Sequence, residues 1–268
     1  MTMMIFPGNL WKNRQLWWRL TEREILGRYR GSTLGLSWSI LNPLAMLAVY
    51  TFVFSQVFKS RWGGLENLGP LGFAVNLFAG LIVFNLFSEC ASRAPSLVVN
   101  NPNYVKKVVF PLEVLGSVAV GTAVFHAIMS LSVLLIFELM LFRCIPATIL
   151  WLPIAWAPLI LGCMAATWVL SSLGVFLRDI NQLIGIAINM LMFLSPIFFP
   201  TSALPQRWQV LLGLNPLAYI IEQTRLVLLE GRGPSAAYAA LGTIIGLVSC
   251  EVAFRFFQRS KKAFADVL

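Results

Sequence analysis

Long apolar stretches alternate with short polar segments along the chain. Six stretches contain no Asp, Glu, Lys or Arg, and most of them reach the roughly 20 residues that a helix needs to cross a bilayer. These stretches cover residues 31–58, 67–88, 114–137, 144–177, 180–206 and 233–250. The pattern predicts an all-α polytopic membrane protein with six transmembrane helices, which we place at about 34–58, 68–88, 114–137, 156–177, 180–199 and 234–254.

Prolines refine two of these predicted helices. In the first stretch, Pro43 removes a backbone hydrogen bond, so we expect a kink early in the helix. The stretch 144–177 is too long for one straight helix and too short for two spans with a turn. Its three prolines all lie in the first half. We therefore expect that half to be irregular or interfacial, and the span itself to begin near residue 156.

The N-terminal segment, residues 1–30, is too polar to cross a membrane but is amphipathic. At 100° per residue, apolar and aromatic side chains fall on one helical stripe and basic side chains on another. The two stripes are Trp11, Trp18, Ile25 and Tyr29, and Lys12, Arg19, Arg23 and Arg30. This pattern predicts an interface helix in the headgroup layer, followed by a transmembrane domain of residues 31–268. A general membrane anchor and a more specific role both fit it.

Two further segments predict helices that are too short to cross. Three prolines divide residues 89–117, between the second and third spans, which favours short helices along the cytoplasmic surface. After the fifth span, the apolar piece 208–221 contains an Asn-Pro pair, which predicts re-entrant outer helices. In the last span, Gly242 and Gly246 have the spacing that allows close helix packing.

The basic residues are concentrated on one side of the predicted topology. The chain is 58% hydrophobic and 12% charged, with a formal net charge of +9. We predict that both termini are cytoplasmic, because 14 of the 20 Lys and Arg residues then face the cytoplasm, as the positive-inside rule requires. The positive charge is thus explained by topology, and we predict no nucleic-acid partner.

The sequence has little of the chemistry expected of an enzyme or an ion pump. It lacks a phosphate loop, so this chain does not bind ATP by that route, and no cofactor or metal is predicted. Few charges lie near the centres of the spans, which argues against an ion-coupled transporter. The acids Glu89, Glu113 and Asp179 are isolated along the chain, which argues against a membrane transferase. His126 lies within a span, and we expect a hydrogen-bonded packing residue there, with a role in proton transfer as the alternative.

Several motifs together resemble a known family. They are LTEREILGRYRGSTLGLSWSILNPLAMLAVYTFVF, NPNYVKKVVFPLEVL, VFLRDI, SPIFFPTSALP and LNPLAYIIE, in this order. They are similar to the membrane subunits of type-two ABC exporters of bacterial cell-surface polysaccharides. The similarity is greatest to O-antigen exporters, and teichoic-acid and capsule exporters are relatives.

This resemblance implies a permease subunit of the bacterial inner membrane rather than an enzyme. It implies a second copy of the chain and two ATP-binding cassette subunits as partners, with ATP and Mg bound by those subunits. The implied cargo is a lipid-linked polysaccharide.

Residues at the beginning of the first span are candidates for binding a polyprenyl diphosphate. Arginine pairs well with phosphate oxygens, and a glycine turn exposes backbone amides that can donate to the same group. The candidates are Arg28, Arg30, Gly31 and Gly35. Anchoring of the helix end to ordinary lipid is the alternative explanation for these arginines.

Two further groups of residues have predicted roles. A sugar chain needs a polar or aromatic path, so we expect the channel to be lined by Trp38, Tyr50, Phe54, Phe58, Asn181, Asn189 and Ser195. Lipid-facing positions would also suit the aromatic residues among them. Contact with the ATPase is predicted for the segment after the second span, through Arg93, Asn100, Asn101, Tyr104, Lys106 and Lys107.

Other functions stay open from the sequence alone. A type-two ABC exporter of a drug or lipid would share the scaffold without needing a wide pore. A polytopic membrane transferase and a passive channel are alternatives of other classes.

Overall fold

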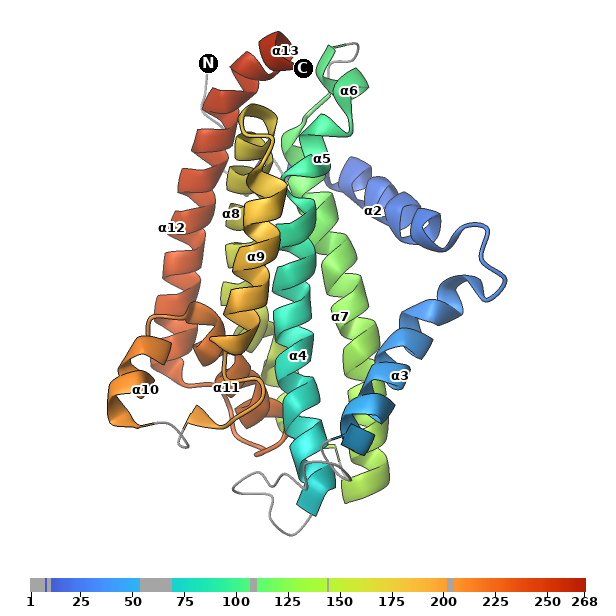
Figure 1. The fold of residues 1–268 in the computed structure, drawn as a ribbon, viewed down its shortest axis with the longest axis vertical. Coiled ribbons are helices and arrows are strands. Elements are labelled where there is room, and N and C mark those ends of the chain that lie inside the picture. The colour runs from blue at the N-terminus through green and yellow to red at the C-terminus, as the bar shows by residue number, and fades with distance from the viewer. Residues whose placement is uncertain (1–7, 9–10, 54–68, 107–109, 144, 202–204) are drawn as a thin grey trace.

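The computed structural model describes residue 8 and residues 11–53, 69–106, 110–143, 145–201 and 205–268 (Figure 1). Helices, turns and loops make up these ranges, and no strand occurs within them. The predicted channel residues Phe54 and Phe58 and the predicted coupling residue Lys107 lie outside the described residues.

Five helical segments are long and apolar enough to cross a membrane among the described residues. They contain α3 (Trp38–Phe52) with a 3-10 turn before it, α4 (Gly69–Arg93), α7 (Glu113–Phe142), α8 (Leu152–Phe176) and α12 (Ala236–Ser260). A further apolar helix, α9 (Ile180–Phe193), has 14 residues. The all-helical membrane fold is confirmed, whereas the number of six spans stays a prediction.

Two helix boundaries differ from the predicted ones, and a proline explains each difference. Helix α8 begins at Leu152, earlier than residue 156, because Pro153 lies in the first helical turn, where the missing N–H costs little. Helix α9 ends at Phe193 rather than near residue 199, because Pro196 disfavours helical geometry at the residue before it.

Helix α4 forms the centre of the molecule. It packs against α3, α7, α8 and α9 and against α11 (Pro216–Leu228). Most of its apolar side chains are fully buried, including Leu77 and Val83. Polar side chains on such a buried helix need polar partners, and those that share one face indicate a polar environment there.

Helix α12 packs along α8, as the predicted glycine spacing suggested. A Cβ atom on Gly242 would lie 2.9 Å from Cγ of Pro158, and one on Gly246 would lie 2.9 Å from Cβ of Leu161. Both distances are too short for a side chain, so these two glycines allow the close approach of the helices.

The predicted short helices occur at opposite ends of the bundle (Figure 1). At one end, α5 (Ser96–Val99) and α6 (Pro102–Lys106) lie beside the C-terminal helix α13 (Phe264–Val267). At the other end, α10 (Gln206–Leu212) precedes α11, which turns back toward α4. This separation agrees with one cytoplasmic and one outer set of short helices.

The N-terminal helix α2 (Arg14–Tyr29) lies across the side of α7. Trp17 donates a hydrogen bond from Nε1 to the carbonyl of Ser117 at 2.9 Å, and Leu20 is buried against α7. A Cβ atom on Gly121 would lie 2.9 Å from Cζ2 of Trp17, so the glycine makes room for the indole. Trp11 and Trp18 of the predicted apolar stripe are exposed, so the membrane contact of that stripe stays a prediction.

Candidate functional site

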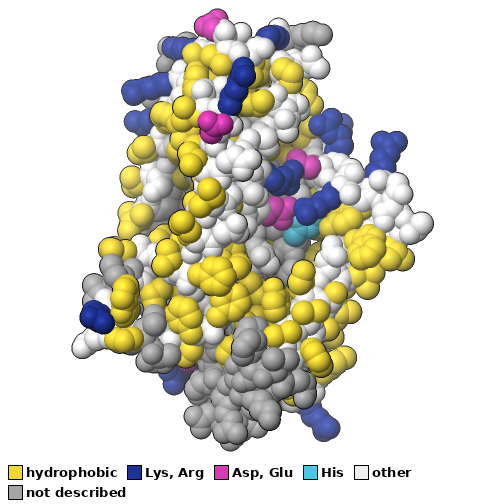
Figure 2. Space-filling view, viewed as in Figure 1, with side chains coloured by type: hydrophobic (Ala, Val, Ile, Leu, Met, Phe, Trp, Pro, Cys, Tyr) yellow, Lys and Arg dark blue, Asp and Glu magenta, His cyan; other side chains and the backbone are white. Residues whose placement is uncertain are grey.

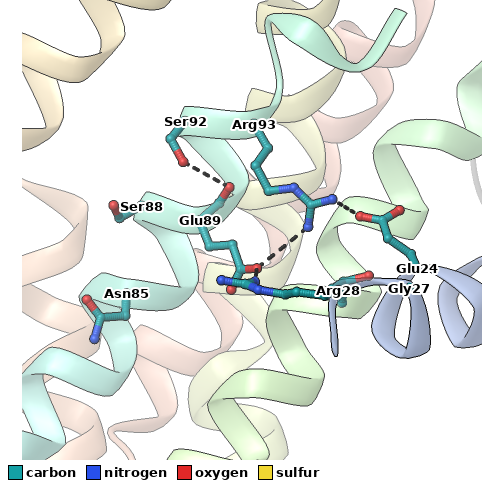
Figure 3. Close-up of a pocket in the computed structure, with 9 residues that line it drawn as sticks. Glu24, Gly27, Arg28, Asn85, Ser88, Glu89, Ser92 and Arg93 are labelled. Atoms are coloured by element: carbon teal, nitrogen blue, oxygen red, sulfur yellow. Dashed lines mark hydrogen bonds and ion pairs between the residues drawn. The ribbon is translucent and has the colours of Figure 1, made fainter. Parts of the chain in front are cut away.

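A polar pocket of about 770 Å³ lies where the C-terminal end of α2 meets α4 and α7 (Figure 3). All three helices contribute to it, and every lining residue except Gly27 has a polar or charged side chain. The lining residues are Glu24, Gly27, Arg28, Asn85, Ser88, Glu89, Ser92, Arg93 and Thr122.

Helical spacing explains why α4 turns its polar residues toward this pocket. Its five lining residues, from Asn85 to Arg93, follow the i, i+3, i+4 pattern of a helix and therefore share one face. The lining residues of α2, from Glu24 to Arg28, have the same spacing. Two polar stripes thus face each other at the edge of an apolar bundle.

The carboxylate of Glu89 is the centre of the cluster. Arg28 Nη1 lies 2.6 Å from Glu89 Oε1, and Arg93 Nη1 lies 3.6 Å from the same oxygen. His126 Nδ1 lies 2.9 Å from the other oxygen, Oε2. Arg93 also pairs with Glu24 of α2 (Figure 3). The cluster therefore joins α2 to α4 and to α7.

The members of this cluster differ in burial. The side chains of Glu89 and His126 are 18% and 16% exposed, whereas that of Arg28 is 53% exposed. Tyr29 packs edge-on to His126, with ring centroids 6.2 Å apart. Burial raises the pKa of the Tyr29 hydroxyl, with Arg28 acting in the opposite direction and Glu89 in the same one. Arg28 is thus more exposed than the other arginine of the cluster, Arg93, which is 32% exposed.

The chain turns sharply after α2. Gly31 has a φ of 85° and Gly35 a φ of 50°, values that residues with a side chain rarely adopt. No atom lies within 4 Å of a Cβ built on either glycine, so the backbone conformation rather than close packing requires them. Arg30 is exposed at the start of this turn. Of the four predicted diphosphate residues, only Arg28 lines the pocket.

The predicted coupling residues do not form one group. Arg93 belongs to the pocket, whereas Asn100, Asn101, Tyr104 and Lys106 lie on or between α5 and α6. Tyr104 accepts a hydrogen bond from Arg23 at 3.2 Å, which connects α2 to this segment.

The predicted channel residues lie in different environments. Asn181 and Asn189 are exposed on α9, and Trp38 is exposed at the start of α3, where its Nε1 donates to Ser32 Oγ at 2.9 Å. Tyr50 is half-buried. Ser195 is fully buried and accepts a hydrogen bond from Asn215 at 2.9 Å, so it is not open to the surface of this chain.

The expectation that the acids are isolated was wrong for Glu89 and Glu113. Glu89 pairs with Arg28 and His126, which lie far away in sequence, and Glu113 pairs with Lys261 at 3.0 Å. The only local signal for this cluster was Arg93, one helical turn after Glu89. His126 is hydrogen-bonded, as predicted, but its partner comes from another helix.

Two guanidinium groups that face a pocket at a helix end form an arrangement suited to phosphate. Arginine offers planar, paired donors that match phosphate oxygens. Among the described residues, no group of His, Cys, Asp and Glu could hold a metal ion. In this structure both guanidinium groups are paired with the carboxylates of Glu24 and Glu89.

Comparison with known proteins gives a consistent result. The O-antigen export system permease protein RfbA of Klebsiella pneumoniae is 24% identical over 251 residues, which cover 93% of each chain. The permease of the same name from Myxococcus xanthus is 25% identical over 266 residues, or 98% of this chain and 99% of the other. The polysialic acid transport protein KpsM of Escherichia coli is 26% identical over 238 residues, or 84% of this chain and 86% of the other.

A family model described as ABC-2 type transporter matches residues 15–229, which include nearly all of α2, the pocket and the helices up to α11. Members of this family that act in export are permease subunits, and ATP hydrolysis belongs to a separate subunit. The chain belongs to the ABC-2 type transporter family.

Proposed function

We propose that the chain is the membrane-spanning subunit of an ATP-driven exporter that moves a polyprenyl-diphosphate-linked polysaccharide, an O-antigen, across the bacterial inner membrane. The similarity to O-antigen export permeases over nearly the whole chain supports the cargo class. The observation that carries the mechanism is the pocket at the C-terminal end of α2, which both Arg28 and Arg93 line.

In this proposal, the pocket receives the diphosphate of the lipid carrier. Its volume of about 770 Å³ falls within the range of roughly 300–1,000 Å³ that is usual for small-molecule sites. Arg28 is exposed at its mouth and would contact the phosphates first, with Arg30 and the turn at Gly31 and Gly35 beside it. The amphipathic helix that carries Arg28 would hold the site at the level of the lipid headgroups.

The polysaccharide itself requires a polar path. Each unpaired hydroxyl costs on the order of 2–7 kcal/mol in an apolar environment, so a sugar chain cannot cross the hydrocarbon directly. We assign the path to the interface between two copies of the chain, related by a twofold axis. Helices α3 and α9 would form its walls, with Trp38, Tyr50, Asn181 and Asn189 on their surfaces.

Exposed apolar side chains on α9 fit such an interface. Leu183, Ile186, Met190 and Phe193 share one face of the helix and are 54–66% exposed. Hydrophobic side chains gather over this side of the molecule, and the charged residues beside the single histidine lie on it as well (Figure 2). The diphosphate pocket and the proposed wall of the channel thus face the same way.

Energy would come from two ATP-binding cassette subunits that bind ATP and Mg. Helices α5 and α6, at the end of the bundle that also holds α13, would contact them through Asn100, Asn101, Tyr104 and Lys106. Lys107, outside the described residues, stays a candidate for the same contact. Cross-linking from cysteines placed at these positions to the ATPase tests the contact. Failure to cross-link at every position would reject it.

Export by an Arg28→Gln variant tests the diphosphate site. Loss of one charged hydrogen-bond donor should weaken binding of the carrier roughly ten- to a hundredfold and reduce the polysaccharide at the cell surface accordingly. Arg19→Gln removes the same charge from an exposed position of the same helix and should leave export unchanged. Membrane insertion is measured for both variants. Normal export by inserted Arg28→Gln would reject the role of Arg28.

A further inference from the structure

We propose that an apolar groove between α2 and the bundle binds one diacyl phospholipid of the membrane, at a site separate from the diphosphate pocket. The groove has a volume of about 990 Å³ and is lined mostly by apolar side chains. Its walls come from α2, the start of the first span, α7 and α8. The inference does not depend on the proposed function, because the groove and the diphosphate pocket have no lining residue in common.

Polar groups in the walls of the groove are already hydrogen-bonded within the protein. Trp17 donates from Nε1 to the carbonyl of Ser117 at 2.9 Å. The hydroxyl of Thr21 donates to the carbonyl of Trp17 at 2.8 Å, and that of Ser117 donates to the carbonyl of Val114 at 2.7 Å. A polar occupant would lose its hydrogen bonds to water and gain few in return, which is costly. The interior of the groove therefore favours a hydrocarbon chain.

The groove is about as deep as one leaflet of a bilayer. Along α7 its wall extends from Ser117, near the start of the helix, to Ile128, near the middle. Eleven residues separate these two, a rise of about 16 Å, which is close to half of the roughly 30 Å of a hydrocarbon core. On α8 the wall consists of Ile160, Leu161 and Met164, also near the middle of the helix. An acyl chain of one leaflet fits this depth, whereas a polyprenyl chain is longer than one leaflet is thick.

A cation lies at the shallow end of the groove. The hydrogen bond between Trp17 and Ser117 places the first turn of α2 beside the start of α7. Arg14, one turn before Trp17, lines the groove and is exposed. Its guanidinium donates to the carbonyl of Trp11 at 3.2 Å and lies 5.1 Å from the centre of the same indole ring. Among the described residues it forms no ion pair, so it is available to a phosphate at the level of the headgroups.

The acid of the groove lies far from this cation. Glu22 follows Arg14 by eight residues on α2, a rise of about 12 Å, and both side chains are exposed. This distance exceeds the Debye length of about 8–10 Å at physiological ionic strength, so screening weakens the repulsion between Glu22 and a phosphate at Arg14. One cation at headgroup level above an apolar groove of one-leaflet depth matches the phosphate and the acyl chains of a phospholipid.

Photo-cross-linking of the complex of this chain with its ATPase tests the inference. The complex is purified in detergent and titrated with a phosphatidylethanolamine that carries a diazirine at the end of one acyl chain, and labelled peptides are identified by mass spectrometry. Labelling near Ile128 and Leu161 should saturate. Labelling of the exposed apolar face of α12, at Ile245 and Val252, should instead rise in proportion to the probe, as ordinary lipid contact does. Excess unlabelled phosphatidylethanolamine should displace the probe from the groove, and polyprenyl phosphate should not.

Matched variants locate the site. Val124→Trp fills the groove and should reduce the saturable labelling roughly tenfold, whereas Ile136→Trp adds the same ring at an exposed position of α7 outside the groove and should not. Arg14→Gln should weaken binding of the probe roughly tenfold through loss of the charged donor, whereas Arg19→Gln, at an exposed position outside the groove, should not. Size-exclusion profiles and thermal stability confirm that each variant is folded.

Three results would overturn the inference. They are labelling in the groove that does not saturate, saturable labelling that folded Val124→Trp retains, and displacement of the probe by polyprenyl phosphate but not by phosphatidylethanolamine. Unchanged binding by Arg14→Gln would reject the contact between Arg14 and the phosphate. Export by Arg28→Gln tests the proposed diphosphate site separately, so either site can fail without the other.

Discussion

The side chain of Arg225 should be a major contribution to the stability of the bundle. It lies on α11 and is only 6% exposed. Its guanidinium group donates to three backbone carbonyls, those of Asn76 on α4 at 3.0 Å, Pro196 at 2.8 Å and Ile197 at 3.2 Å. One side chain thus connects α11, the middle of α4 and the segment after α9.

The Arg225→Met variant keeps most of the side-chain length and removes all three donors. Each buried carbonyl left without a partner costs about 1–3 kcal/mol. We take the lower limit, about 3 kcal/mol in total, because methionine also relieves the cost of burying a cation. At roughly 2 °C per kcal/mol for a chain of this size, the midpoint of thermal unfolding should fall by about 6 °C.

The assay is thermal unfolding of the detergent-purified chain, followed by intrinsic fluorescence or by loss of the monodisperse peak. Arg207→Met is the matched control, because Arg207 is exposed on α10 and its guanidinium lies over the ring of Trp208. That variant should change the midpoint by no more than about 1 °C. A midpoint for Arg225→Met that equals the midpoint of Arg207→Met would refute the assignment of these hydrogen bonds as stabilising.

Two further substitutions test the packing of α2 and of α13. Gly121→Leu should push Trp17 off α7 and make α2 sensitive to protease, whereas Gly162→Leu, at a glycine with open space around its Cβ position, should leave the digestion pattern unchanged. Phe264→Ala removes a fully buried ring at a cost of about 3–5 kcal/mol, so residues 261–268 should exchange amide hydrogens faster. Val267→Ala, at a half-exposed position, should not have this effect, and equal exchange in the two variants would contradict the docking of α13.

Hydropathy and proline positions predicted the helices but not their exact limits. A membrane span is a property of about 20 consecutive residues, so the long apolar stretches were visible without any tertiary information. The limits depend on single residues in a local context. Pro153 is tolerated because it lies in the first turn of α8, and Pro196 ends α9 early because it follows the helix.

The pocket could be predicted only in part, because its residues come from three helices. Arg28 was identified from its place at the start of the first span, and Arg93 was assigned to a different role. Glu89 looked isolated because its partners His126 and Arg28 are 37 and 61 residues away along the chain. Such pairs arise from the packing of α2 and α4 beside α7, which no local pattern encodes.

The sequence pattern also did not indicate which face of α2 packs on the bundle. The 100° pattern emphasised Trp11 and Trp18, which are exposed, whereas Trp17 and Leu20 form the contact with α7. A helix between a membrane surface and a protein has two apolar faces, and helical periodicity alone does not distinguish them.

The central claim is that this chain forms a path for a lipid-linked glycan and is driven by a separate ATPase. The most direct measurement is ATP hydrolysis by the reconstituted complex, with and without polyprenyl-diphosphate-linked glycan. We predict that the glycan stimulates hydrolysis in the wild type and in Arg19→Gln but not in Arg28→Gln, while basal hydrolysis is equal in all three. Hydrolysis that does not respond to the glycan in the wild type, or transport of the glycan by this chain without the ATPase, would contradict the claim.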